Sequence, residues 1–257
     1  MILFSKALYQ SFKLSFTCSN QLANLRTAVV ALILTPLFDL GFSLFFGSSM
    51  GVSSVSYIAQ AVLILSLCLI TAAQISVVFC YLRGEGVFQE LLLRSQYSTA
   101  LYLGIALYAS FVACLSAGVL CLFNIMLYGW TAPLCLSLLY LSPLALILGT
   151  GIGYCAAFAS SYLSDPYAVL SWISAVLPLS SGLIVPLKFY PELLGQVCIY
   201  LPISQLIDCA QSLSFTQLLE GYPLRDLLYA VVFLVLAFLL CQSLKKSIKK
   251  EGMQELI

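Results

Sequence analysis

The sequence predicts an all-α integral membrane protein. We expect six transmembrane helices with an interfacial helix before them, a short cytoplasmic helix after the second span and re-entrant outer helices before the sixth. Of the 257 residues, 62% are hydrophobic and only 8% are charged, whereas a soluble domain carries about 25% charged residues. Six apolar runs are long enough to cross a bilayer, and the basic residues gather on one side of them.

The N-terminal residues 1–22 form the first predicted unit, ahead of a transmembrane domain at 23–257. Apolar side chains recur here every four residues: Phe4, Leu8, Phe12 and Phe16. Lys6 and Lys13 fall on other faces. The stripe is too interrupted for a signal-peptide core, and it predicts an amphipathic helix that lies in the membrane interface.

The predicted spans lie near 28–47, 55–82, 99–125, 133–159, 167–187 and 224–244. Their connections are short, except for about 36 residues between the fifth and the sixth span. Within the fourth span, small residues recur every four positions: Ala145, Gly149, Gly153 and Ala157. Such a row lets helix backbones approach closely, either inside the bundle or against a sister subunit.

The basic residues orient these spans. One side of the membrane receives Lys6, Lys13, Arg26, Arg83, Arg94, Lys245, Lys246, Lys249 and Lys250. The other side receives Lys188 and Arg225. This asymmetry predicts that both termini are cytoplasmic, in a bacterial-type cytoplasmic (inner or plasma) membrane. The net charge of +1 offers no footprint for nucleic acid, so we expect a lipid bilayer and no nucleic acid as partner.

A short amphipathic helix is predicted in the loop between the second and third spans. Gly84 and Gly86 break the second span, and one helical face then carries Val87, Phe88, Leu91 and Leu92. The rest of the surface carries Gln89, Glu90 and Arg94. This helix either docks into a groove of a soluble partner or lies on lipid headgroups.

The outer stretch 186–223 is cut into short pieces by Pro186, Pro191, Pro202 and Pro223. One apolar helical face is expected from Leu206, Ile207, Ala210 and Leu213, and a polar face from Asp208, Gln211 and Glu220. Pieces of this length fit re-entrant or interfacial helices. They form either an outer gate or a structural cap on the bundle.

Asp39 is the acidic residue near the middle of the first span, shortly after Thr35 and Pro36. A carboxylate at that depth costs about 2.5–3.5 kcal/mol on insertion scales, so it should face water or a polar partner. Asp39 and Gln74 are our candidates for the translocation path. Alternatively, Asp39 holds the bundle together through Gln60 or Gln74.

The chain lacks the residues of familiar enzyme and metal sites. It has no histidine, and its ten cysteines show no C-x-x-C spacing, so we expect no metal site. No phosphate-binding loop occurs, because Gly is never followed by Lys. We therefore expect no catalytic residues and no cofactor on this chain. Cys198 and Cys209 fall in the outer stretch, where they form either a disulfide or two packed thiols.

The order of these parts resembles the permease subunits of type-2 ABC exporters. That family carries a charged glycine element and a Glu-Leu-Leu run after its second span, as Arg83-Gly84-Glu85-Gly86 and Glu90-Leu91-Leu92 do here. It also carries a proline-containing outer stretch ahead of a short helix, which Leu201-Pro202-Ile203-Ser204 through Ala210 resembles.

The resemblance implies a membrane subunit that docks on a separate ABC ATP-binding subunit, which would hold the ATP and Mg²⁺. It implies that these residues couple the two subunits: Arg83, Gly84, Glu85, Gly86, Phe88, Glu90, Leu91 and Arg94. A second permease, identical or homologous, would complete a dimer, with the first and fifth spans near its axis. The apolar, aromatic-rich spans suit a hydrophobic or amphipathic cargo.

Two other functions fit the same sequence. A self-sufficient secondary carrier or channel would use Asp39 to couple transport to protons, although such carriers often interrupt helices in both halves of the chain. A non-transporting assembly factor would use the short cytoplasmic helix only to bind a partner.

Overall fold

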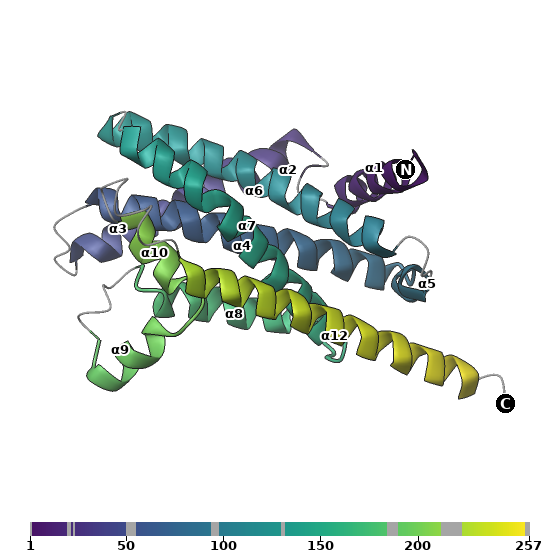
Figure 1. Ribbon diagram of the computed structural model, residues 1–257. Coiled ribbons are helices and arrows are strands. Elements are labelled where there is room, and N and C mark those ends of the chain that lie inside the picture. Colours follow the sequence, from purple (N-terminus) through teal and green to yellow (C-terminus); the bar gives the residue numbers. More distant parts are fainter. Residues whose placement is uncertain are drawn as a thin grey trace.

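The structure is a computed structural model that describes residues 2–19, 22, 24–49, 55–93, 98–129, 132–183, 190–211 and 223–254. Every regular element in these ranges is a helix, and the long helices run roughly along one direction (Figure 1). The helices are α1 (Ile2–Cys18), α2 (Leu25–Val29), η1 (Val30–Leu34), α3 (Thr35–Ser49), α4 (Val55–Gly84), α5 (Phe88–Leu93), α6 (Ser98–Tyr128), α7 (Ala132–Ser160), α8 (Ala168–Ser180), α9 (Glu192–Ile199), α10 (Ser204–Gln211) and α12 (Leu224–Gln254).

Five helical segments in the described ranges are long and apolar enough to cross a membrane, so the chain is a multi-pass membrane protein. They are Leu25–Gly47, Ile58–Gly84, Thr99–Leu127, Leu138–Ser160 and Leu224–Lys250. These segments match five of the six predicted spans. The first span includes the π-helical turn η1 immediately before Thr35 and Pro36. Proline lacks a backbone N–H and crowds the preceding turn, which gives this widened turn its physical reason.

The predicted fifth span, 167–187, differs from the structure. It forms α8, which has 13 residues and a length of about 20 Å, short of the ~30 Å hydrocarbon core. Gly182 adopts φ +76° just after α8, a conformation that glycine tolerates and that commonly ends a helix. Residues 184–189 lie outside the described ranges.

A bent helix pair supplies the sixth membrane element if it is counted as one span. Helices α9 and α10 meet at 86° across a short break, as expected for re-entrant pieces cut by prolines. Pro202 lies in that break, and Ile203 takes φ +78° there. Cys198 on α9 and Cys209 on α10 are not joined by a disulfide. Leu213 and Glu220 of the predicted outer face lie outside the described residues.

Helices α4 and α7 form the centre of the bundle. A Cβ at Gly149 would lie 2.5 Å from the backbone oxygen of Cys68, and one at Gly153 would lie 2.8 Å from the Cα of Ala72. Such distances are shorter than van der Waals contact allows, so only glycine lets these backbones come so close. The small-residue row of α7 therefore packs inside the bundle, against α4.

The N-terminal helix α1 packs on α6. A Cβ at Gly104 would lie 2.5 Å from the Cβ of Ser11, and Phe12 and Phe16 meet the Tyr108 ring edge-on at centroid distances of 5.9 and 6.2 Å. Phe16 still keeps an exposed part, as does Phe4. The helix is thus held by the bundle on one face and leaves apolar side chains on another.

Both ends of the described chain lie at the same end of the bundle, where α5 also lies (Figure 1). The opposite end carries α9 and α10. The five long spans alone would leave the two termini at opposite ends of the bundle. The chain returns between α7 and α12 through α8, which packs against α4 and α7.

Candidate functional site

Arg83, in the last turn of α4, ties the ends of two central helices together. Its guanidinium donates to the backbone oxygens of Ser160 at 3.0 Å and Leu163 at 3.1 Å. Ser160 is the last residue of α7, where carbonyl groups lack intrahelical donors. The planar guanidinium offers several donors at once. Arg83 therefore caps α7 and fixes the start of the connection to α8.

The turn after Arg83 reverses the chain into α5. Gly86 has φ +72°, in the left-handed region that glycine populates without steric cost. Phe88 and Leu92 of α5 are buried, and the Phe88 ring meets Phe79 of α4 edge-on at a centroid distance of 5.7 Å. The short helix predicted from the sequence is present, and two side chains of its apolar face point into its own bundle.

This packing changes which groups of α5 are available to another molecule. Gln89 and Glu90 are exposed, together with Val87 and the glycine turn, while Leu91 is half-buried. A soluble partner would meet these groups and not the Phe88 ring. Arg94, the last of the predicted coupling residues, lies outside the described residues.

Near α5, side chains from three segments surround a cavity of about 360 Å³. Its lining residues are Arg83, Gly86, Phe88, Gln89, Ser161, Tyr162, Leu244, Ser247 and Ile248. The Tyr162 hydroxyl donates a hydrogen bond to the Ser243 hydroxyl of α12 at 3.1 Å, which joins the α7–α8 connection to α12. We call this surface, from Arg83 to Glu90 with 161–167 and 243–248, the α5 platform.

Glu85, another predicted coupling residue, is exposed on the α5 platform. Its carboxylate lies near the end of α1: burial raises the pKa of the Cys18 thiol, and the negative charge of Glu85 raises that pKa further. The platform therefore borders the N-terminal helix as well as the last one.

A second cavity of about 490 Å³ opens between α3, α4 and α8 within the membrane part of the bundle. Asp39 and four serines bring polar atoms to its lining, which also contains many apolar residues: Ser43, Ser66, Ser171 and Ser174. The predicted path residue Asp39 thus faces a cavity large enough for a small amphipathic molecule or for water.

Gln74, the other predicted path residue, is buried in α4 and is not among the described residues that line the Asp39 cavity. Gln60 is buried on the same helix and is also outside that lining. The structure therefore does not bring Asp39 and either glutamine together around one cavity.

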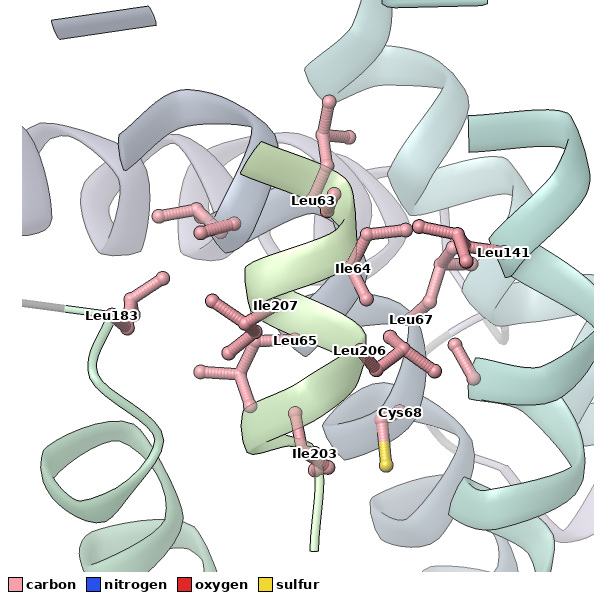
Figure 2. Packing of buried hydrophobic residues seen from close by; sticks show 14 of the residues in the cluster. Leu63, Ile64, Leu65, Leu67, Cys68, Leu141, Leu183, Ile203, Leu206 and Ile207 are labelled. Atoms are coloured by element: carbon pink, nitrogen blue, oxygen red, sulfur yellow. The ribbon is translucent and has the colours of Figure 1, made fainter. Parts of the chain in front are cut away.

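At the opposite end of the bundle, α10 lies between core helices. Figure 2 shows Leu206 beside Leu67 of α4 and Ile207 beside Leu65 of α4, and Leu141 of α7 belongs to the same buried cluster. The described part of the predicted apolar face, Leu206, Ile207 and Ala210, is buried, while Asp208 of the predicted polar face is exposed. The helix is thus embedded in the bundle by its apolar face.

Asp226 holds the beginning of α10, although the sequence had given it no role. Its carboxylate is fully buried and accepts hydrogen bonds from the backbone N–H groups of Ile203 (3.1 Å) and Leu206 (2.7 Å). Helix N-termini present such unsatisfied N–H groups, and an acceptor with negative charge stabilises them. A residue of α12 therefore caps α10.

Arg225 adds a second connection at the same place. Its backbone N–H donates to the Gln205 side chain at 3.1 Å, and its guanidinium donates to the Ser204 hydroxyl at 3.1 Å. The guanidinium also lies 6.0 Å from the centre of the Tyr200 ring, within the range of a cation–π contact. The only sequence signal for these contacts of Arg225 and Asp226 with α10 is that a charged Arg-Asp pair opens an otherwise apolar span.

In the part of the chain that the structure describes, no three His, Cys, Asp or Glu side chains converge in a way that could hold a metal ion. Comparison of the chain with protein-family models and with curated protein sequences gives no match.

Proposed function

We propose that this chain is the transmembrane permease subunit of an ATP-driven ABC exporter, which moves a hydrophobic or amphipathic molecule out of the cytoplasm. The α5 platform is the observation that carries the proposal. It groups polar and charged side chains at the end of the bundle where both chain termini lie. A soluble ATP-binding subunit needs such a surface to act on the spans.

Arg83 would transmit the partner's movement in this scheme. Because its guanidinium bonds to the end of α7, a displacement of α5 and its turn is passed to α4 and α7 together. These two helices form the centre of the bundle, and α10 packs between them at the far end. A push on the α5 platform would thus reach the opposite side of the membrane through continuous packing.

The Asp39 cavity is the part of the chain best placed to receive cargo. It opens between α3 and α8, whose outer faces carry large exposed apolar residues such as Phe38 (73% exposed) and Trp172 (75% exposed). A second permease copy or a homologous permease facing α3 and α8 would close the cavity into a path. The cargo class would be a lipid, a drug-like molecule, a peptide or a lipid-linked glycan.

The proposal is tested by purifying the chain gently from its native membrane. We expect a soluble ATP-binding protein to accompany it, and the complex to hydrolyse ATP. Glu90→Lys should release that protein, because it reverses the charge on the exposed face of α5. Glu192→Lys is the matched control, since Glu192 is also exposed on a short helix but at the opposite end of the bundle. A chain that purifies without any ATP-binding protein would contradict the proposal.

A proton-coupled carrier is the second candidate, and the position of Asp39 on an intramembrane cavity favours it. In that case, transport by the purified chain in vesicles would need a proton gradient and no ATP. Asp39→Asn would abolish this transport, whereas Asp208→Asn, on exposed α10 surface, would leave it intact. Transport that requires ATP and survives Asp39→Asn would exclude the carrier.

A further inference from the structure

A third cavity lies between α6, α7 and α12. Its end at Lys245 and Lys246 adjoins the α5 platform on α12, and the rest of its lining lies outside that platform. Its volume is about 590 Å³. The walls are mostly apolar, and several of the lining side chains are open to the outside of the bundle, as Leu103, Ile147 and Phe238 are. We call it the α12 groove. It therefore faces the surrounding lipid and not the interior of the bundle.

The polar groups in the depth of the α12 groove are already bonded within the protein. The Tyr102 hydroxyl pairs with the Cys241 thiol at 3.1 Å, and the Tyr154 hydroxyl donates to the backbone oxygen of Tyr102. Thr150 donates to the Ile147 carbonyl at 2.7 Å. What remains for an occupant is carbon surface, which suits a hydrocarbon chain.

One end of the groove is strongly basic. Lys245 and Lys246 both line it, next to Gln242 and Thr99. Lys249 and Lys250 follow one turn later on α12 and are exposed, but they do not line the groove. The lysines lie at the end of the bundle where the chain terminates (Figure 1), so the charge sits at one mouth of an apolar groove.

The length of the groove matches one leaflet of a bilayer. Leu234 and Lys246 both line it, and twelve residues of α-helix rise about 18 Å. Half of a hydrocarbon core of ~30 Å is of similar depth. An occupant with its head beside Lys245 and Lys246 would thus place its chain along the groove without leaving its own leaflet.

From these observations we propose that the α12 groove binds an anionic phospholipid. The phosphate would pair with Lys245 and Lys246, and one acyl chain would pack against Leu103, Ile147 and Phe238. Basic sites between transmembrane helices select anionic headgroups by charge, and the apolar groove supplies the site for the chain. This inference does not depend on the proposed export function.

The test is a lipid titration of the purified full chain, followed by native mass spectrometry. Phosphatidylglycerol is compared with phosphatidylcholine of the same acyl chains. We expect phosphatidylglycerol to bind more tightly, and the double variant Lys245→Gln/Lys246→Gln to weaken its binding roughly tenfold while leaving phosphatidylcholine unchanged. The matched control is Lys249→Gln/Lys250→Gln, which removes the same charge outside the groove. It should change binding by less than about twofold, because water and salt screen exposed charges.

A second variant tests the hydrocarbon part of the site. Ala106→Phe places a ring in the groove and should weaken the binding of phosphatidylglycerol without removing charge. Unchanged thermal midpoints for all three variants establish that each remains folded. Equal losses in the two lysine pairs would show diffuse attraction to the basic helix end and overturn the proposal. Equal binding of the two lipids would overturn it as well.

Discussion

Arg83 and Asp226 are charged side chains that hold helices through backbone groups. Arg83 donates to two carbonyl oxygens at the end of α7, and Asp226 accepts from two N–H groups at the start of α10. Hydrogen bonds with one charged partner are stronger than neutral ones. Each residue therefore fixes a helix end at an opposite side of the bundle.

Replacing Arg83 tests its capping role. Arg83→Met removes both hydrogen bonds and should lower the free energy of unfolding by about 1–2 kcal/mol, less than for a buried group because the site is partly exposed to water. Arg83→Lys keeps the charge but not the planar fork, so an intermediate loss is expected. Thermal unfolding in detergent measures both. Arg26→Met, at an exposed position on α2, is the control, and an equal loss there would contradict the capping role.

Replacing Asp226 tests whether its carboxylate caps α10. Asp226→Ala leaves two buried N–H groups without their acceptor, at a cost of about 1–3 kcal/mol for each unsatisfied group. We expect α10 to leave its site more often. In a chain that keeps Cys209 as its sole cysteine, maleimide labelling of this half-buried thiol should then become several-fold faster. Asp208→Ala, on the exposed face of α10, should not change the rate, and equal acceleration would argue against the cap.

At the scale of single residues, the sequence predicted where turns and helices lie better than it predicted which side chains contact each other. The glycine turn after Arg83 was predicted because Gly84 and Gly86 stand among charged residues directly after a long apolar run. The capping of α7 by Arg83 was not predicted, since the carbonyl acceptors lie about 80 residues away in the chain. Asp226 had no local signal either, because an acidic residue in a first helical turn usually stabilises its own helix, whereas this one caps another.

Among the helices, local composition set where most elements begin and end. Five of the predicted spans coincide with helical segments that are long and apolar enough to cross a bilayer, since long apolar runs have few alternatives there. The fifth was wrong in length: its apolar composition continues past Ser180, but the left-handed Gly182 ends α8. Backbone conformation at one glycine decided this, and hydropathy carries no information about it.

The contact between α4 and α7 gives a prediction at this scale. Gly149→Ala should lower the free energy of unfolding by about 1–3 kcal/mol, because the added methyl group would collide with the Cys68 backbone. Gly118→Ala on α6 is the matched control, since a Cβ there meets no atom within 4 Å. It should be neutral or stabilising by about 0.5–1 kcal/mol, as alanine favours helix. The thermal midpoints of both variants measure these effects. An unchanged midpoint for Gly149→Ala would mean that α4 and α7 separate easily, and it would contradict the prediction.

For the molecule as a whole, the two ends of the bundle differ in chemistry. One end carries the α5 platform, both termini and the lysines of α12, and the other end carries the bent helix pair α9 and α10 (Figure 1). By the positive-inside rule, we expect the basic end to face the cytoplasm. The sequence predicted this asymmetry because charge counts survive errors in span boundaries, whereas the three cavities arise only from how the helices pack.

The orientation is tested by single cysteines placed in a cysteine-free chain. Residues Gln89 and Glu192 are both exposed, on α5 and α9 respectively. In intact cells, a membrane-impermeant maleimide should label a cysteine at 192 and not one at 89, and the pattern should reverse in inside-out vesicles. Labelling of both positions from the same side would refute the orientation.

The capping of α10 by Asp226 has a consequence for biogenesis. During synthesis, the start of α10 leaves the ribosome before Asp226 does, because the carboxylate follows the N–H groups of Leu206 and Ile203 by 20 and 23 residues in the chain. Helix α10 thus emerges with the N–H groups of Ile203 and Leu206 unpaired with the Asp226 carboxylate. They acquire this acceptor only when α12 enters the bilayer. The capping of α10 therefore waits for α12, and a nascent chain truncated before α12 keeps these two N–H groups without their acceptor.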